Sequence, residues 1–266
     1  MLQDLAAALS GSRFGPAEVT AVRQLSPHMI RVTLRGELIE DFPGDCAGGH
    51  FKMIVPARDQ SPQEYRAFIA RGDFKAHMRT YTVRHARPQR GEIDVDVATH
   101  GGLGRVGPWA QRTRPEDVIV ISRCGEPKLV TAGAKRILAA ADLTGFPALA
   151  AGLETLAEGV QVDAFVEIPS ADDRQPLRLP AAGRVRWIVK ADPHAPGVEL
   201  IEAVRAAPAP DAKTSVFVAG EFTTVADLRG YFRKEIGVDK SWLYVSSYWK
   251  AGLDEPEHKL VKAAVD

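Results

Sequence analysis

The chain has 266 residues, of which 45% are hydrophobic, and its 34 basic side chains balance its 34 acidic ones. This length suits one large domain or two of ordinary size, and the hydrophobic content is enough for a buried core. The zero net charge excludes a global field that favours nucleic acid or an anionic membrane, so anion binding has to come from local clusters of cations.

No apolar run approaches the ~18 residues of a membrane span, and segment 1–15 is too polar and acidic for a secretory signal. We therefore expect a cytoplasmic protein. Its two cysteines, Cys46 and Cys124, are too few for an iron–sulfur cluster, and a reducing compartment disfavours a structural disulfide. If the protein transfers electrons, an organic cofactor has to carry them.

Residues 1–128 alternate between apolar and polar positions in short runs that turn-forming residues separate. The six runs are 17–25, 29–36, 50–56, 78–86, 92–100 and 117–124. Short strands of this kind predict a six-stranded antiparallel β-barrel. The insert 58–78 interrupts them, with a short helix or a loop expected in its middle.

The fourth run contains RTYTVR, residues 79–84, which concentrates guanidiniums, a phenol and hydroxyls. Strict alternation places Arg79 and Tyr81 on one face and Thr82 and Arg84 on the other. By itself, this run is most simply interpreted as an exposed amphipathic barrel strand.

Residues 102–107, GLGRVG, match the glycine pattern of a dinucleotide-binding βαβ unit, and Glu126 lies about 20 residues further on. The next strand, however, begins near Asp117, and Pro115 shortens the space for a crossover helix. A βαβ crossover needs about 10–12 residues or more. The motif therefore predicts an anion-binding loop on the barrel, in which glycines let the backbone approach a pyrophosphate.

Residues 129–266 follow a different pattern, with apolar strands alternating with helical stretches. The five strands are expected at 135–142, 160–168, 183–191, 215–221 and 240–249, and the helices at 146–159, 197–207 and 224–237. Alternation of this kind predicts an α/β domain with a five-stranded parallel sheet. A further helix is expected at 255–266.

Four landmarks in this order resemble the siderophore-interacting proteins, a flavin-dependent ferric reductase family of the ferredoxin–NADP reductase superfamily. They are RTYTVR at 79–84, HGGLGRVGPWA at 100–110, ADLTGFPALA at 141–150, and 216–233 followed by SSYWKAG at 246–252. The resemblance runs from Glu18 to the end of the chain. It implies an FAD-binding barrel at 1–128 and an NAD(P)-binding-like domain at 129–266.

The resemblance also implies roles for the fourth strand. Tyr81 stacks on the isoalloxazine, Thr82 offers a hydroxyl near N5, and Arg79 binds the FAD pyrophosphate. In the second domain, Thr144 opens the phosphate-proximal turn and Glu221 lies near the nicotinamide. The expected cofactor-binding residues are Arg79, Thr80, Tyr81, Thr82, Val97, Thr99, His100, Gly101, Gly104, Gly107, Pro108, Trp109, Ala110, Thr144 and Glu221.

The implied reaction is reduction of a ferric siderophore, which releases Fe(II) because Fe(II) is held loosely by hard anionic oxygens. It needs no general acid, base or nucleophile, so no catalytic residue is assigned. Cationic side chains are expected to bind the anionic chelate: Lys250 first, then Arg84, Arg105 and Lys128. The histidines at 50, 77 and 85 lack metal-ligand spacing, so no metal site is assigned.

The implied electron donor is NADH, NADPH or ferredoxin, and the absence of a clear arginine pair for a 2′-phosphate favours NADH or a protein donor. We expect a monomer. Two alternatives remain open. One is an NAD(P)H:flavodoxin or ferredoxin oxidoreductase without an iron role, and the other is a siderophore-binding carrier without a redox step.

Overall fold

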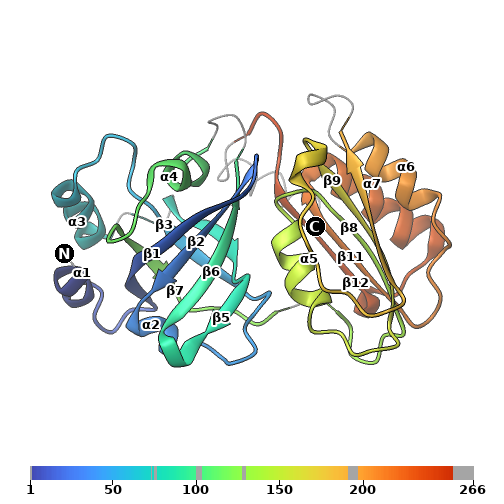
Figure 1. Ribbon diagram of the computed structural model, residues 1–266, viewed down its shortest axis with the longest axis horizontal. Coiled ribbons are helices and arrows are strands. Elements are labelled where there is room, and N and C mark those ends of the chain that lie inside the picture. Colours follow the sequence, from blue (N-terminus) through green and yellow to red (C-terminus); the bar gives the residue numbers. More distant parts are fainter. Residues whose placement is uncertain are drawn as a thin grey trace. The chain divides into compact units, whose positions relative to one another are not determined.

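The computed structural model describes residues 2–72, 74, 77–99, 104–127, 130–190 and 197–253. The chain divides into two compact units, residues 1–127 and 128–266, which are described separately (Figure 1). The helix expected at 255–266 and the predicted site residues His100, Gly101 and Lys128 lie outside the described residues. Among the helices that are described, none has the length and apolar character to span a bilayer.

The first unit contains one antiparallel sheet. Its strands are β1 (Phe14–Ser26), β2 (Met29–Arg35), β3 (His50–Ile54), β4 (Arg79–Thr82), β5 (His85–Arg87), β6 (Glu92–Ala98) and β7 (Val118–Ser122). They follow the order β4-β3-β7-β1-β2-β6-β5. The predicted antiparallel barrel is confirmed, with seven strands in place of six because the fourth predicted run divides into β4 and β5.

The division of that run closes the sheet into a barrel. β4 and β5 stand at opposite ends of the hydrogen-bonded order, although only Val83 and Arg84 separate them along the chain. Val83 N donates to Gly49 O beside β3 at 2.9 Å, and Arg84 N donates to Asp94 O on β6 at 2.8 Å. Consecutive residues therefore bond to the two opposite ends of the sheet.

Helices of the first unit are α1 (Leu2–Ala8), α2 (Glu37–Glu40), α3 (Pro62–Arg71), the 3₁₀ turn η2 (Pro88–Arg90) and α4 (Val106–Arg112). α3 is the helix expected within the insert. A capping box between Ser61 and Glu64 begins it, and Gly72 ends it in the left-handed conformation. Its buried Tyr65 accepts from Val120 N at 3.0 Å, which fixes the helix to β7.

α4 follows the glycine motif but does not belong to a βαβ unit. The next strand, β7, pairs antiparallel with both β1 and β3 in the first sheet. The prediction that GLGRVG belongs to the barrel and not to a βαβ unit is therefore confirmed, with Gly104 and Arg105 in the loop and residues 106–107 in the first turn of α4.

The second unit is a parallel α/β fold. Its strands are β8 (Arg136–Ala141), β9 (Gln161–Ile168), β10 (Gly183–Val189), β11 (Thr214–Glu221) and β12 (Leu243–Trp249). Its helices are α5 (Phe146–Leu153), α6 (Val198–Arg205) and α7 (Phe222–Gly230), with shorter turns η3 (Ala171–Asp173), η4 (Tyr231–Ile236) and η5 (Lys240–Trp242). All strand pairs are parallel, which confirms the predicted five-stranded sheet.

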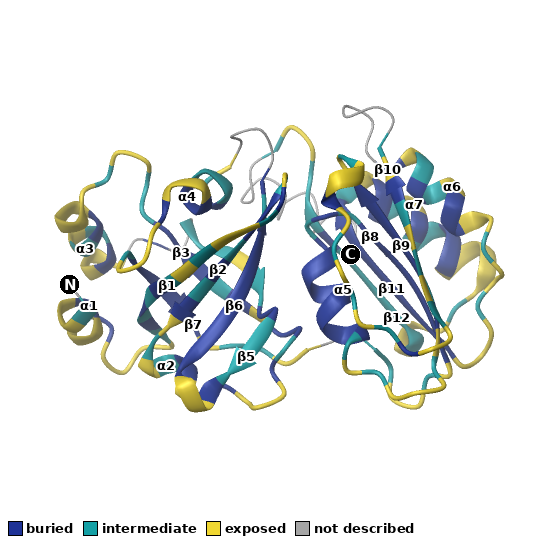
Figure 2. Cartoon of the chain, viewed as in Figure 1, coloured by how far each residue is buried: buried dark blue, intermediate teal, exposed yellow. Residues whose placement is uncertain are grey.

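Helices cover both faces of this sheet, with α5 on one side and α6 and α7 on the other (Figure 1). Every residue of the central strands β8 and β11 is consequently buried (Figure 2). The strand order is β10-β9-β8-β11-β12, so the chain reverses its direction of sheet building between β8 and β11. Open α/β sheets bind ligands at the carboxyl ends of the strands that flank such a reversal.

Candidate functional site

The residues of β4 differ in exposure in a way that suits ligand binding. Thr80 is exposed, and its hydroxyl accepts a 2.5 Å hydrogen bond from Lys52 Nζ. Arg79, Tyr81 and Thr82 are all half-buried. Tyr81 packs against the barrel core with part of its side chain exposed, which leaves aromatic surface for stacking.

Side chains of β4 point alternately to the two faces of the strand, and this alternation ends at Val83 and Arg84, where the barrel closes. Val83 and Arg84 are both buried, at 0% and 5% exposure, although neighbouring residues of a regular strand point to opposite faces. Gly48 N donates to Val83 O at 2.7 Å, so the turn before β3 holds this position from both sides. The strict alternation that separates Tyr81 from Thr82 therefore applies only up to the end of β4.

Two arginines and a histidine lie where β4 approaches the loop after β6; we call His77, Arg79 and Arg105 the cation cluster. Burial, and then the charges of Arg105 and Arg79, hold the pKa of His77 below its usual range. Burial, and then Arg79, also lower the pKa of the Arg105 guanidinium. Like charges in one place disfavour the charged forms, so an anion bound beside them is stabilised.

The sequence segments that form the cation cluster are distant from one another along the chain. Arg79 begins β4, and Arg105 is the N-cap of α4. Gly104, just before it, has φ +78°, and no atom lies within 4 Å of where a Cβ would stand. The predicted phosphate loop and the predicted pyrophosphate-binding strand are thus neighbours in the first unit.

The other predicted residues of this region lie closer to the core. Val97, Thr99, Trp109 and Ala110 are buried, with 0%, 6%, 2% and 1% exposure. The side chains of Val97, Trp109 and Ala110 belong to the barrel core. Gly107 and Pro108, on the first turn of α4, are half-buried.

In the second unit, Thr144 and Glu221 already have partners within the chain. Thr144 donates to Asp142 Oδ1 from its hydroxyl at 2.5 Å and from its amide at 2.8 Å. Glu221 is 3% exposed and caps α7 through Thr223 N at 2.5 Å. Their roles in nucleotide binding stay predictions.

Lys250 follows β12, and its ammonium lies over the ring of Phe222 at 4.5 Å from the centroid. A cation–π contact of this kind holds the lysine stem while leaving the charge intact. Its role in substrate binding also stays a prediction.

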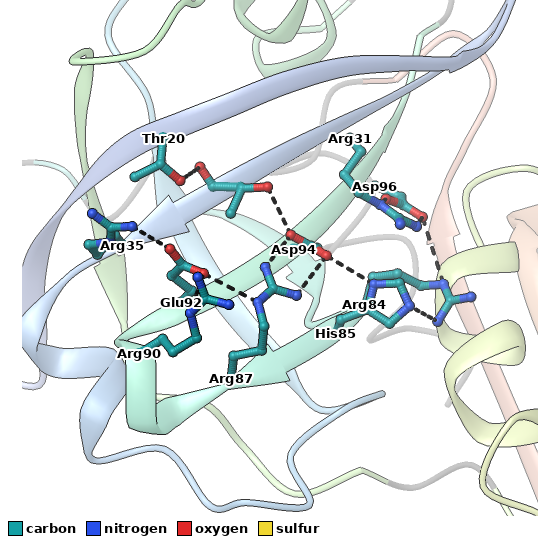
Figure 3. A network of polar contacts seen from close by, with 11 residues as sticks. Thr20, Arg31, Arg35, Arg84, His85, Arg87, Arg90, Glu92, Asp94 and Asp96 are labelled. Carbon is teal, nitrogen blue, oxygen red and sulfur yellow. Dashed lines mark hydrogen bonds and ion pairs between the residues drawn. The ribbon is translucent and has the colours of Figure 1, made fainter.

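Arg84 belongs to a ladder of cross-strand ion pairs and hydrogen bonds on the barrel of the first unit (Figure 3). The ladder joins β2 to β6 through Arg31 with Asp96, Thr33 with Asp94, and Arg35 with Glu92. Arg84 Nε lies 3.8 Å from Asp96 Oδ2, and Arg84 Nη1 donates to His85 Nε2 at 3.0 Å. These contacts orient Arg84 beside the end of β4, where a direct contact with substrate stays a prediction.

The middle of this ladder stabilises ionised carboxylates. Burial by itself raises the pKa of Asp94, but hydrogen bonds from His85, Arg87 and Thr33 outweigh burial and lower that pKa. Sequence reasoning missed the ladder, although alternate residues of 31–35 and 92–96 carry complementary groups that signal it. It also missed His77 as part of an anion site and Asp142 as the partner of Thr144.

Metal ligation has no candidate in the parts of the chain that the structure describes. No group of three or more His, Cys, Asp or Glu side chains there is placed to hold an ion. The thiols of Cys46 and Cys124 are both free.

Comparison with known proteins gives matches to two family models. Residues 18–127 match the siderophore-interacting FAD-binding domain, and residues 134–252 match the siderophore-interacting protein model. The chain is 30% identical to ferric vibriobactin reductase ViuB of Vibrio cholerae, with 88% of each chain covered. It is 26% identical to the NADPH-dependent ferric-chelate reductase of Escherichia coli, over 90% of this chain and 94% of that one.

A similar solved structure is the siderophore-interacting protein SipS from Aeromonas hydrophila. It is 27% identical, has a TM-score of 0.81, and is matched over 95% of this chain and 98% of its own. The similarity therefore includes both units rather than one.

Proposed function

This chain belongs to the siderophore-interacting protein family, and on that premise we propose that it is an FAD-dependent reductase of ferric siderophores. The observation that carries the proposal is the cation cluster of His77, Arg79 and Arg105, with the half-buried Tyr81 two residues after Arg79 on β4. FAD has both a pyrophosphate and a large flat ring system. The cation cluster suits the pyrophosphate, and the aromatic ring of Tyr81 suits the flat ring system.

The residues present fit FAD by their chemistry. The guanidiniums of Arg79 and Arg105 suit the two phosphates, which they bind as planar forks of donors. Gly104 lets the backbone of its loop approach an anion. Tyr81 offers an aromatic face, and Thr82 offers a hydroxyl that donates or accepts a hydrogen bond.

When bound, FAD supplies the chemistry that side chains lack, since it takes an electron pair from the reductant and gives electrons singly to Fe(III). The chain's own part is to hold the cofactor, exclude water behind it and bind the chelate. The substrate iron then leaves as Fe(II), because hard anionic oxygens hold that ion weakly. No side chain is assigned a proton transfer.

Lys250 is the residue we assign to the anionic chelate, whereas Arg105, which the sequence analysis placed with the chelate, is assigned to the pyrophosphate of FAD. The cation–π contact with Phe222 keeps the ammonium of Lys250 in one place. Arg84 is 5% exposed and paired with Asp96, and we assign it a supporting place at the end of β4. The electron donor is NAD(P)H or ferredoxin, and the protein acts as a monomer in the cytoplasm.

Two measurements test this function on the purified protein. The first is the visible spectrum, which for bound oxidised flavin has a band at about 450 nm. The second is anaerobic mixing of the chemically reduced protein with a ferric catecholate or hydroxamate. Fast reoxidation of the flavin, with Fe(II) trapped by a chelator, supports a siderophore reductase.

The same experiments separate the alternatives. Rapid electron transfer to flavodoxin or ferredoxin without acceleration of ferric-chelate reduction indicates an oxidoreductase without an iron role. A colourless protein that does not take up FAD but binds ferric chelates indicates a carrier. Either result contradicts the proposed function.

A further inference from the structure

Cys46 and Cys124 are the two cysteines of the chain, and the function proposed above uses neither of them. Cys46 lies in the turn between α2 and β3, and Cys124 lies two residues after β7. They stand 78 positions apart in the sequence, yet Cys46 belongs to the barrel core of the first unit and Cys124 packs against the same core. What these two thiols do together is independent of the proposed function, because neither is assigned to the flavin or the chelate.

Two glycines let the segments that carry the cysteines approach each other closely. A Cβ on Gly49 would stand 2.7 Å from Cys124 Sγ and 2.8 Å from Cys46 O. A Cβ on Gly125 would stand 2.7 Å from Cε1 of the His50 ring. Both positions therefore favour glycine, which brings no side chain into these contacts. The turn before β3 consequently lies directly against the residues that follow β7.

Backbone hydrogen bonds fix this approach from both sides. Gly49 N donates to Cys46 O at 2.8 Å, and Cys46 N donates to Pro43 O at 3.1 Å, which defines the turn. Gly125 N donates to His50 O at 2.8 Å, which continues the contact between β3 and β7 beyond the end of β7. The positions of both cysteines are thus set by the backbone of the barrel.

The two thiols are in contact within this packing. Cys124 Sγ lies 3.1 Å from Gly125 O and 4.0 Å from Cys46 O. A hydrogen bond between the two thiols lowers the pKa of Cys46 and raises the pKa of Cys124, as expected when Cys124 donates and Cys46 accepts. The packing therefore brings together the two sulfur atoms that a disulfide would join.

Cys46 and Cys124 differ in their access to solvent. Cys46 is 0% exposed, whereas Cys124 is half-buried. A dissolved oxidant therefore reaches Cys124 first, and the Cys46 sulfur is the nucleophile beside it. One cysteine that meets the oxidant and a second that condenses with its product are the two parts of a reversible thiol switch.

We propose that Cys46 and Cys124 form a reversible intramolecular disulfide when the protein meets hydrogen peroxide. In the first step, an S–O bond forms at Cys124, the O–O bond of the peroxide breaks, and the thiol proton leaves with the other oxygen as water. In the second step, the Cys46 sulfur attacks the Cys124 sulfur, the S–O bond breaks, and hydroxide leaves with the Cys46 proton as a second water. The two thiols lose two electrons, which reduce the peroxide.

The disulfide ties the turn before β3 to the end of β7, next to the closure of the barrel. Gly48 N donates to Val83 O at 2.7 Å, and Val83 N donates to Gly49 O at 2.9 Å, so the same turn also holds the end of β4. A cross-link between residues 78 positions apart restricts the unfolded chain and so favours the folded barrel. Oxidation therefore makes the barrel more resistant to unfolding, and a dithiol reverses the change.

Peroxide treatment of the purified protein, followed by alkylation of the remaining thiols in denaturant, tests this proposal. We expect both cysteines to be alkylated before treatment, neither after it, and both again after dithiothreitol. Mass spectrometry of a non-reducing digest should show the peptide with Cys46 linked to the peptide with Cys124. The melting temperature of the oxidised protein should rise by about 5 °C or more, and dithiothreitol should cancel the rise.

Two single variants separate a disulfide from other oxidation of the same thiols. In Cys46→Ala, the sulfenic acid on Cys124 has no partner and should be trapped by dimedone. In Cys124→Ser, which keeps the size of the side chain, the buried Cys46 should remain a thiol through the same treatment. Neither variant should show the rise in melting temperature. The peptide mapping uses wild type alone, so it decides the question even if Cys46→Ala does not fold.

Several results would overturn the proposal. They are wild-type protein that keeps both thiols in peroxide, that is oxidised to sulfinic or sulfonic acid without a cross-link, or that links two chains to each other. Equal melting temperatures of the reduced and the cross-linked protein would overturn the stabilising role. FAD content enters none of these readouts, so failure of the proposed function would leave them unchanged.

Discussion

The two units of this chain produce opposite local fields at the positions where a nucleotide cofactor is expected. In the first unit, Arg79 and Arg105 bring positive charge together at the start of β4, beside His77, whose pKa is lowered. In the second, Asp142 and Glu221 place carboxylates on the amides of α5 and α7. The net charge of the whole chain is zero, but its two units differ locally. The first unit has a cationic position that suits an anion, and in the second unit carboxylates of the chain already bind the backbone amides.

This difference separates cofactor from reductant. A tightly bound anionic cofactor is favoured at a site where it relieves the repulsion between like charges of the protein. The cation cluster is such a site. A site whose donors are satisfied by the chain binds an external phosphate only by exchange. The comparison therefore predicts tight binding of FAD by the first unit.

The largest expected effect is loss of the cofactor from the first unit. Replacing Arg79 and Tyr81 together with alanine should weaken FAD binding by about a thousandfold, because it removes a charge-assisted contact and a stacking surface. The protein should purify colourless but folded, as judged by circular dichroism. Arg23→Ala, on the exposed side of β1, is the control and should remain yellow. Unchanged flavin affinity in the double variant would refute the site.

The second prediction concerns the ion-pair ladder of the first unit. It tests how much the free energy of unfolding depends on the arginine partner of a buried carboxylate. Arg31→Met should lower the free energy of unfolding by about 3 kcal/mol, because it removes a main partner of a buried carboxylate. That carboxylate, Asp96, has 0% of its side chain exposed. Arg35→Met is the matched variant and should cost less than about 1 kcal/mol, since the Arg35 side chain is 55% exposed. Urea denaturation measures both, and equal losses would contradict this account.

A smaller effect is expected at Lys250. Lys250→Ala should weaken binding of a ferric siderophore about fivefold to tenfold, the size of one partly exposed charge contact. FAD content should not change. Fluorescence quenching titrations with the ferric chelate measure the affinity, and Lys240→Ala, on the η5 turn at the opposite end of β12, is the control. Identical affinity in wild type and Lys250→Ala would remove this residue from the substrate site.

The smallest effect concerns pH and the apoprotein. The pKa of His77 is lowered in the folded state, so between that value and about 6.5 the unfolded chain binds more protons. Stability of the apoprotein should therefore decrease as the pH falls below about 6.5. His77→Gln should reduce this slope, measured by thermal melting across pH 5 to 7. A slope identical to that of wild type would show that burial and the two arginines do not lower the pKa of His77.

Much of the fold follows from the sequence alone. The two periodicities predicted an antiparallel barrel followed by a parallel α/β sheet, and both are present. The strand count differed because the fourth predicted run changes its pairing partner between β4 and β5. Val83 and Arg84 make that change through backbone hydrogen bonds, which leave no mark on hydrophobic periodicity.

The candidate site was predicted less completely. Arg79 was expected at the pyrophosphate and Arg105 at the chelate, and their proximity depends on barrel closure rather than on sequence spacing. Thr144 was expected to meet a nucleotide, whereas it donates twice to Asp142. A carboxylate two residues before an expected phosphate-binding hydroxyl is visible in the sequence, yet only side-chain geometry shows that it turns back onto that loop.

The central claim is that the first unit binds FAD through β4 and the loop before α4. Its most direct test is titration of flavin-free protein with FAD. Binding is monitored by absorbance at about 450 nm and by quenching of flavin fluorescence. The account predicts one FAD per chain and submicromolar affinity that weakens markedly in Arg105→Ala. Saturating FAD that leaves the protein colourless, or binding that is insensitive to both Arg79 and Arg105, would contradict it.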